Sequence, residues 1–163
     1  MRLAVGSDHR GYVVRLHLVE LANRLGHEVE EIGPPDSEAA DYPDIAAQVA
    51  TMVSRGVVDR GILVCGTGLG MCIMDNKCPG IRATPCHDDL TAEMSRRHLD
   101  ANVLCLSADL LGEQLIFRIV KTWLDAPFEG ADGGRHARRV EKITQLERKY
   151  LCCPRNWSTQ FRG

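Results

Sequence analysis

Residues 61–70 of the chain read Gly61-Ile-Leu-Val-Cys-Gly-Thr-Gly-Leu-Gly70. A short apolar run that ends in a glycine-rich turn is typical of a buried strand that leads into a helix. The thiol of Cys65 stands where the strand ends, beside backbone N–H groups that stabilise a thiolate or hold a nearby oxyanion. The stretch therefore predicts an α/β fold with an active site at the carboxyl end of this strand.

Short β-like runs alternate with helix-period segments on both sides of this stretch. The expected strands are residues 2–6, 27–32, 61–64, 81–86 and 103–107, and the expected helices are residues 13–26, 41–55, 69–76, 88–97 and 110–124. Parallel neighbours need crossover helices, and those crossovers are right-handed. The alternation therefore predicts a three-layer, Rossmann-like α/β domain with a five-stranded parallel sheet.

The remaining chain completes one domain, residues 1–150. Residues 128–134 form a glycine-rich connection, and residues 135–150 a charged C-terminal helix whose apolar positions are expected to pack on a neighbour. The tail, residues 151–163, has no periodicity. It contains Trp157 and Phe161, so it either covers a surface groove or is disordered.

Composition excludes several classes of partner. The net charge of −2 gives no electrostatic reason to expect a nucleic acid or a membrane surface, and no apolar run is long enough for a membrane span or a signal peptide. Seven cysteines without Cys-x-x-Cys spacing predict reduced thiols and no zinc site. We therefore expect a cytoplasmic protein.

Polar clusters follow four of the expected strands, at residues 7–9, 65–70, 86–88 and 107–109. Since the carboxyl ends of parallel strands meet at one edge of the sheet, these clusters should converge there. The glycine turn matches neither the P-loop nor the dinucleotide fingerprint, so nucleotide binding is not expected. Such a turn is structural about as often as catalytic, and Cys65 favours chemistry.

Each other candidate has a structural alternative. Asp8 is either a functional carboxylate or a helix N-cap. His98 stands near a helix end, where a histidine often makes only a favourable dipole interaction. Arg135 and Arg139 share a helix face and are spaced to grip a phosphate, although a solvated charged face is the commoner explanation.

The motifs taken together resemble the ribose-5-phosphate isomerase B family, which also contains galactose-6-phosphate and allose-6-phosphate isomerases. The resemblance covers about residues 1–148. Its motifs are Gly6-Ser-Asp-His-Arg-Gly11, Asp41-Tyr-Pro43, Cys65-Gly-Thr-Gly-Leu-Gly-Met71, Asn76-Lys77, Gly80-Ile-Arg-Ala83, Cys86-His-Asp88, Ser95-Arg96, His98, Asp100-Ala-Asn-Val103 and Gly133-Gly-Arg-His136.

The resemblance implies aldose–ketose isomerisation of a phosphorylated sugar through an enediolate. Cys65 would move a proton between C1 and C2, and His98 would open the sugar ring; Thr67 completes the implied catalytic set. The implied substrate-binding residues are Asp8, His9, Tyr42, Gly66, Gly68, Leu69, Gly70, Leu99, Asp109, Arg135 and Arg139. Among these, His9 and the two arginines would bind the phosphate. The family uses no metal or organic cofactor and works as homodimers or homotetramers whose sites combine two subunits.

Two positions depart from the family pattern. Leu99 stands where ribose-5-phosphate isomerases usually have asparagine, and Asp109 where the family commonly has an arginine that helps to hold the substrate. A small insertion around residues 131–132 also precedes the arginine helix. The expected substrate pair is D-ribose 5-phosphate and D-ribulose 5-phosphate, with a tetrose or hexose phosphate, of galactose 6-phosphate or allose 6-phosphate type, as the alternative.

Two other functions remain open on the sequence. One is a cysteine hydrolase with Cys65 as nucleophile and His9 or His98 as its base. The other is a non-catalytic sugar-phosphate sensor on the same fold. The presence of Cys65, Thr67 and His98 argues against the sensor, since a protein that only binds has no need of a base.

Overall fold

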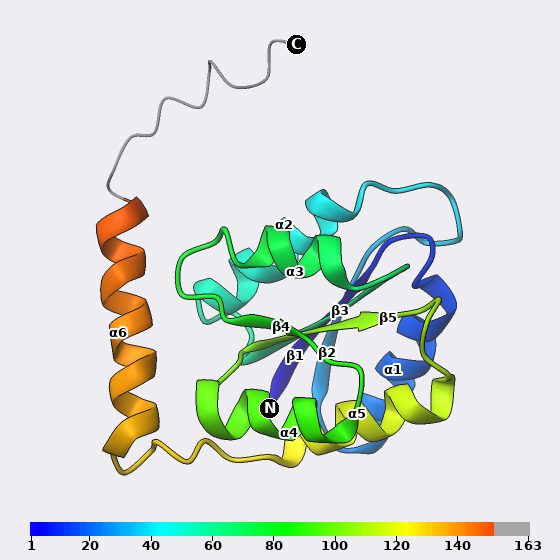
Figure 1. The fold of residues 1–163 in the computed structure, drawn as a ribbon. Coiled ribbons are helices and arrows are strands. Elements are labelled where there is room, and N and C mark those ends of the chain that lie inside the picture. The colour runs from blue at the N-terminus through cyan, green and yellow to red at the C-terminus, as the bar shows by residue number, and fades with distance from the viewer. Residues whose placement is uncertain (152–163) are drawn as a thin grey trace.

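The computed structural model describes residues 1–151, in which strands and helices alternate (Figure 1). The elements are β1 (Arg2–Ser7), α1 (Tyr12–Arg24), β2 (Glu28–Ile32), α2 (Tyr42–Ser54), β3 (Arg60–Cys65), α3 (Leu69–Asp75), β4 (Ala83–Pro85), α4 (Asp89–Leu99), β5 (Val103–Ser107), α5 (Glu113–Asp125) and α6 (Gly134–Leu151). The tail expected to cover a groove or to be disordered, with Trp157 and Phe161, lies outside the described residues from residue 152 onward.

The strands form one sheet in the order β2-β1-β3-β5-β4, and every neighbouring pair is parallel. This confirms the predicted five-stranded Rossmann-like fold. Strand β4 is shorter than expected because it lies at the edge of the sheet, where the Asn76 side chain bonds the backbone N–H and C=O of Ala83. Helix α5 begins later than expected, because the N–H of Leu110 donates to the hydroxyl of Ser107 and closes a turn first.

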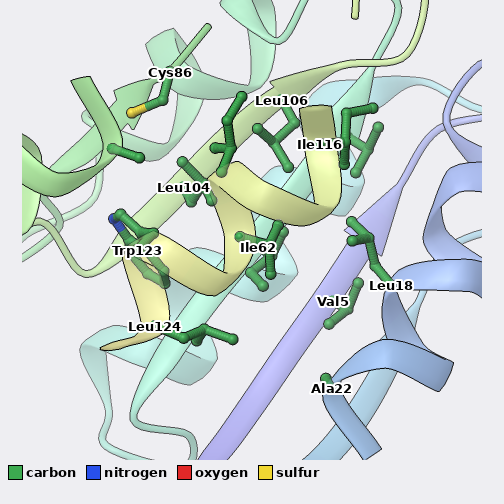
Figure 2. Close-up of a cluster of buried hydrophobic side chains, with 14 of the residues drawn as sticks. Val5, Leu18, Ala22, Ile62, Cys86, Leu104, Leu106, Ile116, Trp123 and Leu124 are labelled. Carbon is green, nitrogen blue, oxygen red and sulfur yellow. The ribbon is translucent and has the colours of Figure 1, made fainter. Parts of the chain in front are cut away.

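Helices cover both faces of the sheet. Helices α1, α4 and α5 pack on one face around Trp123, which is fully buried against Ile62 and Leu104 of the strands (Figure 2). Helices α2 and α3 pack on the other face, where Leu63 and Cys65 point. Because successive strand residues face opposite sides, β3 contributes to both layers and is buried along almost its whole length.

Helix α2 packs closely on the sheet because the strands beneath it carry glycines. A Cβ atom built on Gly61 would lie 2.7 Å from Val49, and one on Gly6 would lie 2.9 Å from the same side chain. The missing side chains let the helix backbone approach the sheet. This packing fixes the start of α2 above the glycine turn that follows β3.

Helix α6 stands beside the body of the domain rather than on the sheet (Figure 1). It contacts the domain through α4 and through a hydrogen bond from the N–H of Gly80 to Glu147. Ile143, Leu146 and Tyr150 remain exposed on it. Among residues 1–151, no helix has the length and apolar character needed to span a lipid bilayer.

One carboxyl group is buried without compensation. Asp75, at the end of α3, is fully buried, and neither of its side-chain oxygens has a hydrogen-bond partner among residues 1–151. Burial, with a smaller contribution from the nearby Cys72, raises the pKa of Asp75 to about 8. The carboxyl group is therefore protonated in the folded protein up to neutral pH.

We expect Asp75→Asn to stabilise the protein in a pH-dependent way. The pKa of Asp75 in the folded protein lies above its ordinary value of 3.8. Burial of this group therefore costs the wild type no stability from ionisation below about pH 4, and the wild type loses stability as the pH rises toward 8. The variant avoids that loss, so its free energy of unfolding should exceed that of the wild type by about 5 kcal/mol near pH 8.5 and nearly match it near pH 4. Urea unfolding at both values tests this, and an unchanged pH dependence would contradict it.

Candidate active site

The thiol of Cys65 lies at the start of the glycine turn. Its sulfur accepts a hydrogen bond from the backbone N–H of Gly68 at 3.1 Å, and its side chain is almost wholly buried. Gly68 has a φ of 77°, a left-handed conformation that glycine adopts without strain, and it precedes the first residue of α3. The turn therefore directs a backbone donor at the sulfur, as the sequence predicts for a reactive thiol.

The segment after β5 forms one wall of this turn. The carbonyl of Gly66 accepts hydrogen bonds from the hydroxyl of Ser107 at 2.6 Å and from the N–H of Asp109 at 3.1 Å. A Cβ atom on Gly66 would lie 2.9 Å from the Asp109 carboxylate. That carboxylate pairs with Arg10 at 2.8 Å. The negative charge of Asp109 at this wall is thus matched by a cation from the loop after β1.

The loop after β1 forms a second wall. The buried Asp8 accepts hydrogen bonds from the N–H groups of Arg10 and Gly11 through Oδ1, so this oxygen organises the start of α1. His9 accepts a hydrogen bond from the N–H of Ala40 through Nδ1 at 3.4 Å. Asp8 is therefore not the N-cap of α1, which is Gly11; its carboxylate instead holds the turn before the helix, at the carboxyl edge of the sheet.

Tyr42 and Thr67 complete this edge. A Cβ atom on Gly70 would lie 2.7 Å from the Tyr42 ring, so the ring lies directly over the glycine turn. Thr67 is exposed, and its hydroxyl accepts a hydrogen bond from the N–H of Leu69 at 3.3 Å. The fold brings together at this edge Asp8, His9, Tyr42, Cys65, Gly66, Thr67, Gly68, Leu69, Gly70 and Asp109.

The other expected site residues lie at the opposite edge. Helix α4 connects two parallel strands, so it runs against them and ends where they begin. Accordingly, the carbonyl of Leu99 accepts a hydrogen bond from Arg82, which precedes β4. His98 shares this helix end, and α6, with Arg135 and Arg139, begins beside it (Figure 1). One chain therefore does not bring His98, Leu99 and the two arginines to Cys65.

His98 belongs to a compact network. Its ring stacks on that of His136 with centroids 4.3 Å apart and planes 9° apart. Oε2 of Glu129 lies 3.6 Å from Nε2 of His98 and 3.9 Å from Nε2 of His136, and Arg97 pairs with the same carboxylate. The hydrogen bond from Arg97 holds the pKa of Glu129 below its usual value. Burial and the neighbouring cations lower the pKa of His136.

Sequence reasoning missed Glu129. It lies in the segment expected to be a glycine-rich connection, and nothing in the local pattern distinguishes it from a solvated charge. In the structure its N–H donates to the carbonyl of Arg97 at 2.9 Å, which ties this connection to α4. A charged side chain inside a glycine-rich segment between two helices is the only signal that the sequence offers.

Three side chains of this network lie close enough together to be considered as metal ligands. One ligand atom each from His98, Glu129 and His136 falls within 4.8 Å of the others. However, Arg97 pairs with the carboxylate, and Arg135 donates to Nε2 of His136 at 3.1 Å. The stacked rings also keep their in-plane nitrogen lone pairs in two separate, nearly parallel planes. The arrangement fits a hydrogen-bonded network better than a metal centre.

A groove of about 330 Å³ runs along the outer side of α4, beside the edge strand β4. His98 and Leu99 line one end of it and Cys86 the other. Its remaining lining residues are Thr84, Pro85, Thr91, Met94 and Ser95. Cys65 is not among the residues that line this groove.

Comparisons with known proteins extend over nearly the whole chain. The family model described as Ribose/Galactose Isomerase matches residues 3–143. Ribose-5-phosphate isomerase B of Escherichia coli is 44% identical over 91% of this chain and 97% of its own. D-erythrulose-4-phosphate isomerase of Pectobacterium atrosepticum is 38% identical over 90% of this chain and 95% of its own.

A solved structure agrees with these similarities. The structure of ribose-5-phosphate isomerase B from Clostridium thermocellum superimposes with a TM-score of 0.88 at 47% identity, and it covers 92% of this chain and 99% of its own. The matched range includes the glycine turn with Cys65, the end of α4 with His98 and the start of α6 with both arginines. The chain belongs to the ribose/galactose isomerase family.

Proposed function

We propose that this protein is an aldose–ketose isomerase that interconverts D-ribose 5-phosphate and D-ribulose 5-phosphate through an enediolate, with Cys65 as the base. The hydrogen bond from the N–H of Gly68 to the Cys65 sulfur, within a turn that offers further backbone donors, carries the proposal. The similarity to ribose-5-phosphate isomerase B of Escherichia coli supports the choice of substrate class.

The chemistry follows from the turn. The thiolate of Cys65 removes the proton from C2 of the open-chain aldose, and the C1 carbonyl oxygen becomes the enediolate oxygen. A proton then passes from the C2 hydroxyl to that oxygen, the C2 carbonyl forms, and the proton held by Cys65 is returned to C1 to give the ketose. Backbone N–H groups of residues 66–70 hold that oxygen, and such preorganised donors are worth about 3–4 kcal/mol each. Asp8 and Thr67 contact sugar hydroxyls in this proposal.

A cysteine hydrolase is less well supported. It requires a histidine against the nucleophile. Among residues 1–151, the hydrogen bond to the Cys65 sulfur comes from Gly68, while His9 accepts from Ala40 and His98 lies at the opposite edge of the sheet. A proton transfer between adjacent carbons needs only the thiolate and the oxyanion donors, both of which the turn supplies.

The complete site requires two copies of the chain. His98, Arg135 and Arg139 lie at the amino edge of the sheet, so in our proposal they act on a substrate bound at the Cys65 turn of a neighbouring subunit. The groove beside α4 and the exposed Ile143 and Leu146 of α6 provide apolar surface for that contact. We therefore propose a homodimer or a homotetramer with shared sites, in which the arginines and His9 bind the phosphate.

A four-carbon sugar phosphate is the second candidate substrate. Leu99 offers no hydrogen bond to a sugar hydroxyl where relatives that act on ribose 5-phosphate usually have asparagine. Asp109 is neutralised by Arg10 and offers no positive charge to the substrate. The relative named D-erythrulose-4-phosphate isomerase is similar over nearly its whole length. These observations favour a test of substrate length.

We propose the cytoplasm as the site of action. The mechanism needs a reduced thiol at Cys65, and reducing compartments keep cysteines in that state. The cysteines that the structure describes, Cys65, Cys72, Cys78, Cys86 and Cys105, are all free.

We expect Cys65→Ser to abolish isomerisation of ribose 5-phosphate, with a loss of kcat of about 100-fold or more, because a hydroxyl is a far weaker acid than a thiol and supplies no anionic base. Cys72→Ser is the matched control. A hydrogen bond with Cys105 lowers the pKa of Cys72 to about 7, so Cys72 is another cysteine that could serve as an anionic base near neutral pH. It lies buried in α3. A steady-state assay of ribulose 5-phosphate formation should find the control close to wild type. Equal losses in both variants, or full activity in Cys65→Ser, would refute the assignment.

Substrate choice is tested at Leu99. We expect Leu99→Asn to raise kcat/KM for ribose 5-phosphate by about tenfold, because the amide regains a hydrogen bond to a sugar hydroxyl. The value for erythrose 4-phosphate, which has one hydroxyl fewer, should change little. Measurement of kcat/KM for both sugars with the wild type and the variant tests this prediction. Equal changes for the two sugars would show that residue 99 does not distinguish substrates by their length.

A further inference from the structure

We propose that Glu129 is a positioning residue for the opening of the sugar ring. Together with the stacked ring of His136, it holds His98 in the orientation that proton transfer requires. This inference rests on the proposed function and assigns a role to a residue at the amino edge of the sheet that the mechanism above does not use. It is carried by the contacts around the Glu129 carboxylate.

The two oxygens of Glu129 face different partners. Arg97 donates to Oε1 from Nε at 2.7 Å and also from Nη2, and Arg97 is itself held by Glu93 at 2.6 Å. The backbone N–H of Glu129 donates to the carbonyl of Arg97. Main chain and side chain are therefore both fixed to α4, and Oε2 is left to face His98 and His136.

The two imidazoles constrain one another. The ring stack sets the plane of His98, and the hydrogen bond from Arg135 to Nε2 of His136 makes that nitrogen an acceptor, so the second ring is neutral. The lowered pKa of His136 agrees with a neutral ring. The side chain of His98 is 36% exposed, so it remains open to a sugar while its other sides are held.

Ring opening places strict demands on such a histidine. The C1 hydroxyl loses its proton to the imidazole, the bond between C1 and the ring oxygen breaks, its electron pair stays on that oxygen, and the oxygen receives a proton while C1 becomes a carbonyl. The imidazole thus takes up one proton and gives one back, and it is positively charged between these events. A carboxylate at 3.6 Å from Nε2 stabilises that charge and fixes the ring that carries it.

Ring opening can be separated from the isomerisation step experimentally. Ribose 5-phosphate is largely cyclic, whereas ribulose 5-phosphate is open-chain because its phosphate occupies the oxygen that would close a five-membered ring. Exchange of the C1 proton of ribulose 5-phosphate in D₂O, followed by NMR, therefore reports on proton abstraction by Cys65 alone. Conversion of ribose 5-phosphate reports on ring opening as well.

We expect Glu129→Gln, in the full-length protein, to lower kcat/KM for ribose 5-phosphate about tenfold or more, since general acid–base catalysis typically contributes 10²–10⁴-fold. Deuterium exchange into ribulose 5-phosphate should stay within about twofold of the wild type. Glu93→Gln is the matched control, because Glu93 pairs with the same Arg97 but contacts neither histidine. It should leave both rates near the wild-type values.

Three results would overturn the inference: an equal fall of both rates in Glu129→Gln, an unchanged rate with ribose 5-phosphate, or the same selective loss in Glu93→Gln. An equal fall would mark Glu129 as merely structural. A wild-type protein that exchanges no deuterium into ribulose 5-phosphate would instead refute the proposed function itself, so the two failures are distinguishable.

Discussion

The parallel direction of all five strands is the constraint on which the rest of the molecule depends. Every strand ends at one edge of the sheet, and every crossover helix must end at the other. Cys65 ends a strand and His98 nearly ends a helix, so the fold separates them however the loops are built. In the proposed reaction, which needs both groups, one of them would then come from another copy of the chain, so the shared site that we propose follows from the geometry of the sheet.

Each edge is built rigidly. At the carboxyl edge, the close approach of α2 over Gly61 and Gly6 places Tyr42 on the glycine turn, and Ser107 holds the carbonyl of Gly66. At the amino edge, the C-cap of α4 is Asp100, which has a φ of 47° and pairs with Arg82 and Arg96 at 2.9 Å each. These contacts fix the helix end from which His98 projects, and Glu129 then restrains its ring. Preorganisation of this kind is what proton transfers require.

Much of the fold was predictable from local patterns. The apolar runs with glycine or polar ends located the strands, and the thiol at the end of β3 marked the carboxyl edge as the place for chemistry. The short β4 was not predictable, because a side chain, Asn76, replaces a neighbouring strand at that edge. Glu129 was missed because its significance arises from a contact with Arg97, 32 positions earlier. The sequence identified His98 and Arg135 through motifs, but only the topology separates them from Cys65.

The shared site is tested most directly by mixing two inactive variants, Cys65→Ser and His98→Asn, under conditions that allow subunits to exchange. In a mixed dimer one site combines an intact Cys65 with an intact His98, so a random mixture should recover about a quarter of wild-type turnover of ribose 5-phosphate. Each variant alone should stay inactive, and mixed dimers should be detected by native mass spectrometry. Mixed dimers that form without any recovery of activity would contradict a site built from the two edges of neighbouring subunits.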